Sequence, residues 1–156
     1  MKTSPPTPRL ALNFPGTLAG FERGFAELRA GLARESLTPA ARYNVELVFE
    51  EIVANIVRYG AKDRVVDIRV MLDVRDDSLA LTFDDDGVAF DPNTKPDPVP
   101  AKSLADASIG GRGIMLVRRL SSAIDYDRTP EQRNRLVVTL PLPAVGIEQE
   151  QKSQHR

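Results

Sequence analysis

Hydrophobic positions in the first third of the chain follow two different spacings. In residues 9–16, RLALNFPG, every second residue is apolar, which is typical of a strand with one buried face. After Thr17, a good helix cap, the apolar residues recur at helical spacing. They are Leu18, Phe21, Phe25, Leu28 and Leu32. The pattern therefore predicts a strand followed by a helix.

A second, longer helix is predicted to begin at Thr38-Pro39 and to run to Gly60. Thr38 supplies a cap, Pro39 suits the first helical turn, and Gly60 suits the end of a helix. The apolar stripe of this helix consists of Val45, Val48, Phe49, Ile52, Ile56 and Tyr59.

The rest of the chain predicts four strands, one loop and one further helix. Residues 65–74 and 78–86 form an antiparallel hairpin around the polar turn 75–77. Residues 91–103, DPNTKPDPVPAKS, are rich in proline and read as a long loop. A glycine-opened helix, a short strand around 124–126 and a last strand over 135–142 follow. This order predicts an α+β two-layer sandwich, with helices on one face of a mostly antiparallel mixed sheet.

Composition narrows the class of protein. With 156 residues and 42% apolar content, the chain suits one domain, and a net charge of −1 argues against nucleic acid and anionic membranes as partners. The absence of cysteine excludes disulfides, thiol catalysis and the common zinc sites. We expect a flexible N-terminus over 1–9, a domain over 10–143 and a disordered polar tail over 144–156. No signal peptide or membrane span is evident, so a cytoplasmic location is expected.

Two residues of the longer helix are candidates for chemistry. Glu51 and Asn55 are four residues apart, so they share one side of the helix at the border of its apolar stripe. There the carboxylate could accept a proton and the amide could bind a divalent cation such as Mg²⁺. A solvated polar pair at a helix boundary is the alternative. Glu46 and Glu50 lie on the outer face and are weaker candidates.

The stretch FDDDGVAFDP contains a second candidate site. Leu79, Leu81 and Phe83 point to one side of their strand, so Asp85 points inward with them. A buried aspartate could accept a hydrogen bond from an exocyclic amine such as that of adenine, and Gly87 would let a flat base approach the backbone. An acidic turn without a ligand is the alternative, whereas the spacing does not fit a calcium loop.

Three glycines in SIGGRGIMLVRRL open the third helix. Backbone N–H groups at a helix N-terminus suit a phosphate, although a helix cap or a linker can look similar. The Walker motif is absent, and the glycines do not match the dinucleotide fingerprint.

Taken in order, E-x-x-x-N, D-x-G-x-x-F and G-x-G resemble the GHKL (Bergerat-fold) ATP-binding domains of gyrase-type ATPases and histidine kinases. Within that group the chain is most similar to RsbW-type anti-sigma-factor serine kinases, and the match runs from about Leu10 to Leu142. The resemblance implies the histidine-kinase-like ATPase fold, ATP or ADP as ligand, and Mg²⁺.

The resemblance also implies roles for particular residues. Glu51 would be the general base, and Asn55 would hold Mg²⁺. Asp85 would bind the adenine amine, with Gly87 beside it. The implied nucleotide-binding set further contains Phe90, Gly110, Gly111, Arg112, Gly113 and Ile114. The segment 92–108 falls where the family has its ATP lid.

Two positions depart from the family pattern. Ile109 stands where some family kinases carry an arginine that reaches the γ-phosphate, and Arg112 lies inside the glycine motif instead. Tyr59 replaces a histidine that often follows the E-x-x-x-N motif.

By resemblance, we expect an anti-sigma factor that phosphorylates a serine on a STAS-type anti-anti-sigma partner, binds a sigma factor or similar regulator, and forms a homodimer. A nucleotide-sensing binding module without kinase activity is the first alternative, and a structural protein without a nucleotide is the second.

Overall fold

The computed structural model describes residues 7–94 and 111–143, and for Gly111 and Arg112 it describes the backbone alone. The elements, in chain order, are β1 (Leu10–Pro15), α1 (Leu18–Leu32), α2 (Pro39–Tyr59), β2 (Asp67–Val74), β3 (Ser78–Asp85), the short 3₁₀ helix η1 (Pro92–Thr94), α3 (Gly111–Leu120), β4 (Ala123–Arg128) and β5 (Asn134–Pro141). The parts expected at 1–6, 95–110 and 144–156, which include most of the lid and Gly110, lie outside the described residues.

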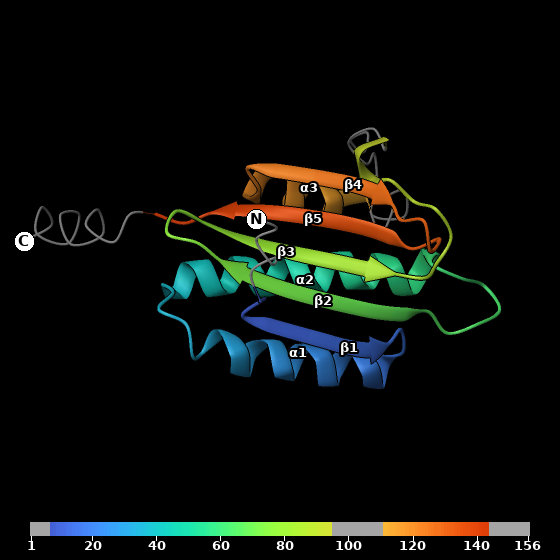
Figure 1. Cartoon of the computed structure of the whole chain (residues 1–156), viewed down its shortest axis with the longest axis horizontal. Coiled ribbons are helices and arrows are strands. Elements are labelled where there is room, and N and C mark those ends of the chain that lie inside the picture. The colour runs from blue at the N-terminus through green and yellow to red at the C-terminus, as the bar shows by residue number, and fades with distance from the viewer. Residues whose placement is uncertain (1–6, 95–110, 144–156) are drawn as a thin grey trace, which may run out of the picture.

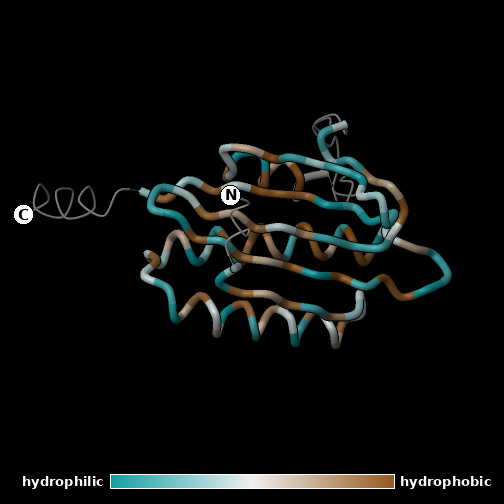
Figure 2. The backbone as a smooth tube through the Cα atoms, viewed as in Figure 1, coloured by the Kyte–Doolittle hydropathy of each residue, from teal (hydrophilic) through white to brown (hydrophobic). Residues whose placement is uncertain are grey.

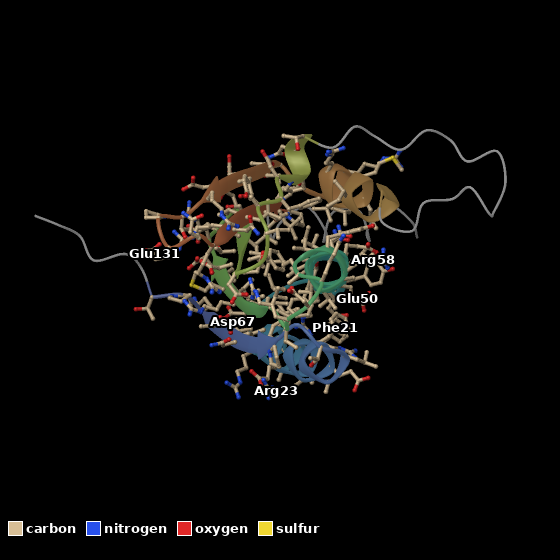
Figure 3. All side chains as sticks on the ribbon, turned by 90° about the vertical axis from the view of Figure 1, so that its right-hand side faces the viewer. Phe21, Arg23, Glu50, Arg58, Asp67 and Glu131 are labelled. Atoms are coloured by element: carbon tan, nitrogen blue, oxygen red, sulfur yellow. The ribbon has the colours of Figure 1, made fainter. Side chains whose placement is uncertain are left out.

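The strands form one sheet in the order β1-β2-β3-β5-β4, and all four pairings are antiparallel. The helices α1, α2 and α3 cover one face of this sheet, while the described residues leave its other face open (Figure 1; end-on in Figure 3). The predicted α+β two-layer sandwich is therefore confirmed, including the hairpin of β2 and β3. A mostly antiparallel mixed sheet was expected. Among the described strands, all neighbouring pairs are antiparallel.

The core fills the space between the sheet and the helices. Alternate residues of each strand point inward, and Figure 2 shows hydrophobic and hydrophilic positions mixed along the strands in this way. The ring of Phe49 on α2 lies 5.8 Å from that of Phe14 on β1 and 6.4 Å from that of Phe83 on β3. These aromatic contacts join α2 to the middle of the sheet.

The expected stripe of α1 is wrong at its first residue. Leu18 is 74% exposed, whereas Gly20 and Gly24 are buried on the side that faces β1. A Cβ atom at Gly24 would lie 2.7 Å from the ring of Phe14, and one at Gly20 would overlap the carbonyl oxygen of Pro15. The glycines therefore let α1 approach β1 closely, and they are buried although the apolar pattern did not include them.

The expected stripe of α2 is correct except at its end. Val45, Val48, Phe49 and Ile52 are buried, whereas Tyr59 is 43% exposed because it lies at the mouth of the pocket described below. Within the described ranges, no helix combines the length and the apolar character that crossing a bilayer would require.

Candidate functional site

A pocket lies between the inner face of the sheet and the helices α2 and α3. The space inside it is about 470 Å³, part of which is open to solvent. Its polar lining includes Asn55, Asp85 and Asn134. The apolar walls include Ile52, Phe83, Ile114 and Leu136.

Helix α2 supplies the first pair of candidate residues. Asn55 is only 8% exposed and lines the pocket, and Glu51 is half-buried one turn earlier. The neighbouring Glu50 is exposed on the side of α2 away from the sheet (Figure 3). The structure therefore separates Glu51 from Glu50, as the helical spacing predicted.

The Glu51 carboxylate lies directly against Gly113 in the first turn of α3. A Cβ atom at Gly113 would overlap its Oε2 atom, so only glycine leaves room for this carboxylate. Sequence reasoning assigned Gly113 to phosphate alone and missed this packing role. The contact brings the first and third motifs, on α2 and α3, into van der Waals range.

Asp85 ends β3 and points inward, and only 5% of its surface is exposed. Its Oδ1 atom accepts hydrogen bonds from the Gly87 amide at 2.9 Å and from Asn134 Nδ2 at 3.1 Å. Burial raises the pKa of Asp85 above its ordinary 3.8, although both hydrogen bonds oppose that rise. Among the described residues, no group donates a hydrogen bond to Oδ2.

Gly87 joins the turn after β3 to the end of α2. A Cβ atom at Gly87 would lie 2.7 Å from the carbonyl oxygen of Gly60, and the Val88 amide donates to the same oxygen at 2.8 Å. The glycine thus permits a backbone-to-backbone contact between the Asp85 turn and the helix that bears Glu51 and Asn55.

The other two aspartates of the DDD sequence belong to the open face of the sheet. Asp84 binds the guanidinium group of Arg133, which also donates to Asp67 Oδ2 at 3.1 Å. Asp86 pairs with Arg64. Burial acts to raise the pKa of Asp86, but the hydrogen bond from the Asp67 amide and the Arg64 charge together lower it. Only Asp85 therefore faces the pocket.

Sequence reasoning missed Asn134 and Tyr126 as pocket residues. Asn134 lies opposite Asp85 in the ladder between β3 and β5. Its side chain accepts a hydrogen bond from the Tyr126 hydroxyl at 2.6 Å. A usable signal existed, because Asn134 shares the inward parity of Leu136, Val138 and Leu140, and a polar residue at an inward strand position indicates a buried site.

Two aromatic rings stand at the pocket mouth. Tyr59 from α2 and Phe90 from the segment after β3 are near parallel, with ring centroids 6.2 Å apart. Phe90 was predicted to contact a nucleotide, whereas Tyr59 was predicted as the end of the apolar stripe of α2 and noted as a replacement for histidine.

The remaining predicted residues are described in part. Ile114 is buried and lines the pocket. Gly111 and Arg112 lie in the first turn of α3, but the Arg112 side chain is not described. Gly110 and Ile109 lie outside the described residues. Within those residues there is no group of three or more His, Cys, Asp or Glu side chains that could hold a metal ion.

Comparison with known proteins identifies a matching family and several similar proteins. The model of the histidine kinase-like ATPase domain matches residues 14–140. The serine/threonine-protein kinase BtrW of Bordetella bronchiseptica is 30% identical over 96 residues, which cover 61% of this chain and 68% of BtrW.

Similar chains are also found among solved structures. One chain of the SiaB–SiaC complex of Pseudomonas aeruginosa is 17% identical and aligns with a TM-score of 0.54, over 85% of this chain and 89% of that one. The histidine kinase domain of the E. coli osmosensor EnvZ is 15% identical, with a TM-score of 0.45 over 92% and 94%. The SiaB–SiaC chain shows the same fold.

Proposed function

Because this chain belongs to the histidine kinase-like ATPase family, we propose that it is an ATP-dependent protein serine/threonine kinase. We further propose that it is an anti-sigma factor that binds a sigma factor and phosphorylates a STAS-type antagonist, and that it acts as a homodimer in the cytoplasm. The relative BtrW, a serine/threonine-protein kinase, supports the activity. The SiaB–SiaC relative shows that a chain of this fold can form a complex with a second protein.

One observation carries the proposal: Asn55 and Asp85 line one largely apolar pocket, and Glu51 and Gly113, which directly precede the lining residues Ile52 and Ile114, contact each other beside it. Asp85 supports adenine as the base, because its Oδ2 atom is an acceptor without a described partner and the C6 amine of adenine is a donor. The apolar walls suit the two faces of a purine ring.

The phosphates would lie toward α3. Its first turn contains Gly111 and Gly113, whose backbone N–H groups and helix dipole favour an anion. Asn55 is the described side chain that would hold Mg²⁺, and phosphate oxygens fit as the other ligands because the described residues offer no acidic cluster. When bound, this ion would offset phosphate charge.

Glu51 would be the general base. Its carboxylate lies beside Gly113, at the phosphate end of the site. It would accept the proton of the partner serine while the serine oxygen forms a bond to the γ-phosphorus and the bond from that phosphorus to the ADP oxygen breaks. The products are then protonated Glu51, the phosphorylated serine and ADP.

A nucleotide-sensing module without kinase activity is the second candidate. The observation in its favour is Ile109, which stands where some family kinases carry an arginine for the γ-phosphate.

Transfer of labelled phosphate distinguishes the two functions. The chain is incubated with γ-labelled ATP, Mg²⁺ and the STAS protein encoded nearest to it, and label on the STAS serine is measured. We expect label on that serine and none when the serine is replaced by alanine. Binding of ATP and of the partner without transfer would support the sensor instead.

A further inference from the structure

The Asn134 side chain lies at the centre of five hydrogen bonds beside the pocket. Its Nδ2 atom donates to Asp85 Oδ1 at 3.1 Å and to the Val88 carbonyl at 2.8 Å. Its Oδ1 atom accepts from the Tyr126 hydroxyl at 2.6 Å, from Arg128 Nη1 at 3.1 Å and from the Phe90 amide at 3.2 Å. Both amide hydrogens are thus engaged within the protein, which leaves none for a ligand.

These partners fix the orientation of the amide. Three donors surround Oδ1, and two acceptors face Nδ2. Turning the amide by 180° would place its N–H groups against the Phe90 amide and Arg128 and its oxygen against the acceptors Asp85 and Val88, so only the contact with the Tyr126 hydroxyl, which can also accept, would remain. Since Asn134 is 5% exposed, water could not replace the lost partners, and such a loss in a buried site is costly.

The fixed amide determines which oxygen of Asp85 faces the pocket. Asn134 Nδ2 and the Gly87 amide both donate to Oδ1, and no described group donates to Oδ2. We propose that Asn134 is a positioning residue that holds Asp85 by Oδ1 and so presents Oδ2 to the amine of the base, with Tyr126 and Arg128 holding the Asn134 amide. This inference rests on the proposed binding of an adenine nucleotide.

Arg128 extends the network to the backbone of the turn. Its Nη1 atom donates to the Gly87 carbonyl at 2.9 Å as well as to Asn134. Gly87 in turn lies against Gly60 at the end of α2. The strands β4 and β5 therefore hold the base-binding turn and, through it, the helix that bears Glu51 and Asn55.

A pair of ligands separates positioning from general support of the fold. ATP has the C6 amine, and purine riboside triphosphate is the same molecule without it. If Asn134 acts through the contact between Asp85 and the amine, its loss must weaken ATP much more than the analogue.

We therefore measure the dissociation constants of both ligands by calorimetry for the parent chain and for Asn134→Leu. Loss of a hydrogen bond to a charged group predicts that ATP binds about 10–50-fold more weakly to the variant. The analogue is expected to lose less than about 3-fold, because its base makes no contact that Asp85 must orient. An equal loss for both ligands would overturn the positioning role.

Two further variants make the result decisive. Tyr126→Phe removes one hydroxyl and no packing volume, and we expect the same preferential loss for ATP, by about 3–10-fold. If Asn134→Leu does not fold, Tyr126→Phe tests the proposal in its place. An equal loss of affinity for both ligands would again overturn the proposal. Asn13→Leu, an exposed asparagine on β1, is the matched control and should change neither constant.

The parent chain itself tests the premise. If it does not bind ATP, the proposed function fails and the positioning role fails with it. If it binds ATP and shows the expected preference over the analogue, but the variants lose both ligands equally, only the positioning role fails.

Discussion

Glu51 has room for its carboxylate because position 113 has no side chain. In the structure the carboxylate occupies the space that a Cβ atom of residue 113 would need. Side-chain size at a residue of α3 therefore controls the placement of the proposed base on α2.

Gly113→Ala is predicted to displace that carboxylate and to lower phosphoryl transfer. General-base catalysis is worth about 10²–10⁴-fold, so we expect a loss in that range by the labelled-phosphate assay. The double variant Gly113→Ala/Glu51→Ala should be no slower than either single variant, because both remove the same function. Losses that multiply would show that Gly113 acts independently of Glu51.

Glu51→Ala is predicted to separate catalysis from binding. A general base acts in the transition state, so ATP affinity should stay within a few-fold while transfer falls by about 10²–10⁴. Asn55→Ala should instead weaken ATP binding as well, since it removes the proposed metal ligand. The control is Glu50→Ala, whose side chain is exposed on the outer side of α2. Transfer by Glu51→Ala at the parent rate would exclude the catalytic role.

Asp85→Asn is predicted to stabilise the fold while abolishing ATP binding. Burial raises the pKa of Asp85, so the folded state holds a proton on it more tightly than the unfolded state does. The ionised carboxylate therefore disfavours folding at neutral pH, and this cost declines as the pH falls below the raised pKa and is gone below the ordinary 3.8.

Thermal melts at several pH values measure this effect. The melting temperature of Asp85→Asn should exceed that of the parent at pH 7, and the difference should shrink on acidification. A variant that is less stable than the parent at pH 7 would show that the hydrogen bonds to Asp85 outweigh its burial.

At the level of whole elements, the close packing of α1 on β1 depends on the buried Gly20 and Gly24 rather than on Leu18, the apolar residue that begins the helix. Gly24→Ala would place a Cβ atom 2.7 Å from the Phe14 ring, which is itself fully packed. We expect a loss of about 1–3 kcal/mol in the free energy of unfolding, measured by denaturant titration.

Gly31→Ala in the same helix is the matched control. Its Cβ atom would also come 2.7 Å from a neighbour, but that neighbour is the flexible end of the Leu10 side chain, which can move. Alanine favours helix over glycine, so the change should be neutral or stabilising. Equal losses at both glycines would contradict the close packing of α1 on Phe14.

The elements themselves could be predicted because their patterns are strong and local. The period-2 and period-3.6 spacings, the Thr17 and Thr38 caps and the polar turn 75–77 placed the α-helices and strands close to their observed bounds, whereas the short 3₁₀ helix η1 lies within the predicted loop 91–103. The exposure of Leu18 and the burial of Gly20 and Gly24 could not be predicted, because they depend on how closely α1 approaches β1.

For the molecule as a whole, the parts of the site that could be predicted are those that depend on the pattern within one helix or strand. Asp85 was placed on the inner side by strand parity, and Asn55 by helical spacing, and both line the pocket. The contact of Gly113 with Glu51 and that of Asn134 with Asp85, 49 positions earlier, join residues far apart in the sequence, which only the fold brings together. The matched family model agrees with the resemblance found from the motifs.

The measurement that decides this account is calorimetric titration of the parent chain with ATP and with GTP in the presence of Mg²⁺. Asp85 offers an acceptor where adenine has an amine and guanine has a carbonyl oxygen, so two acceptors would face each other in a GTP complex. We predict saturable binding of ATP, at least about 10-fold weaker binding of GTP, and loss of ATP binding in Asp85→Ala. Equal affinity for both nucleotides, or no binding of ATP, would contradict the assignment of this pocket.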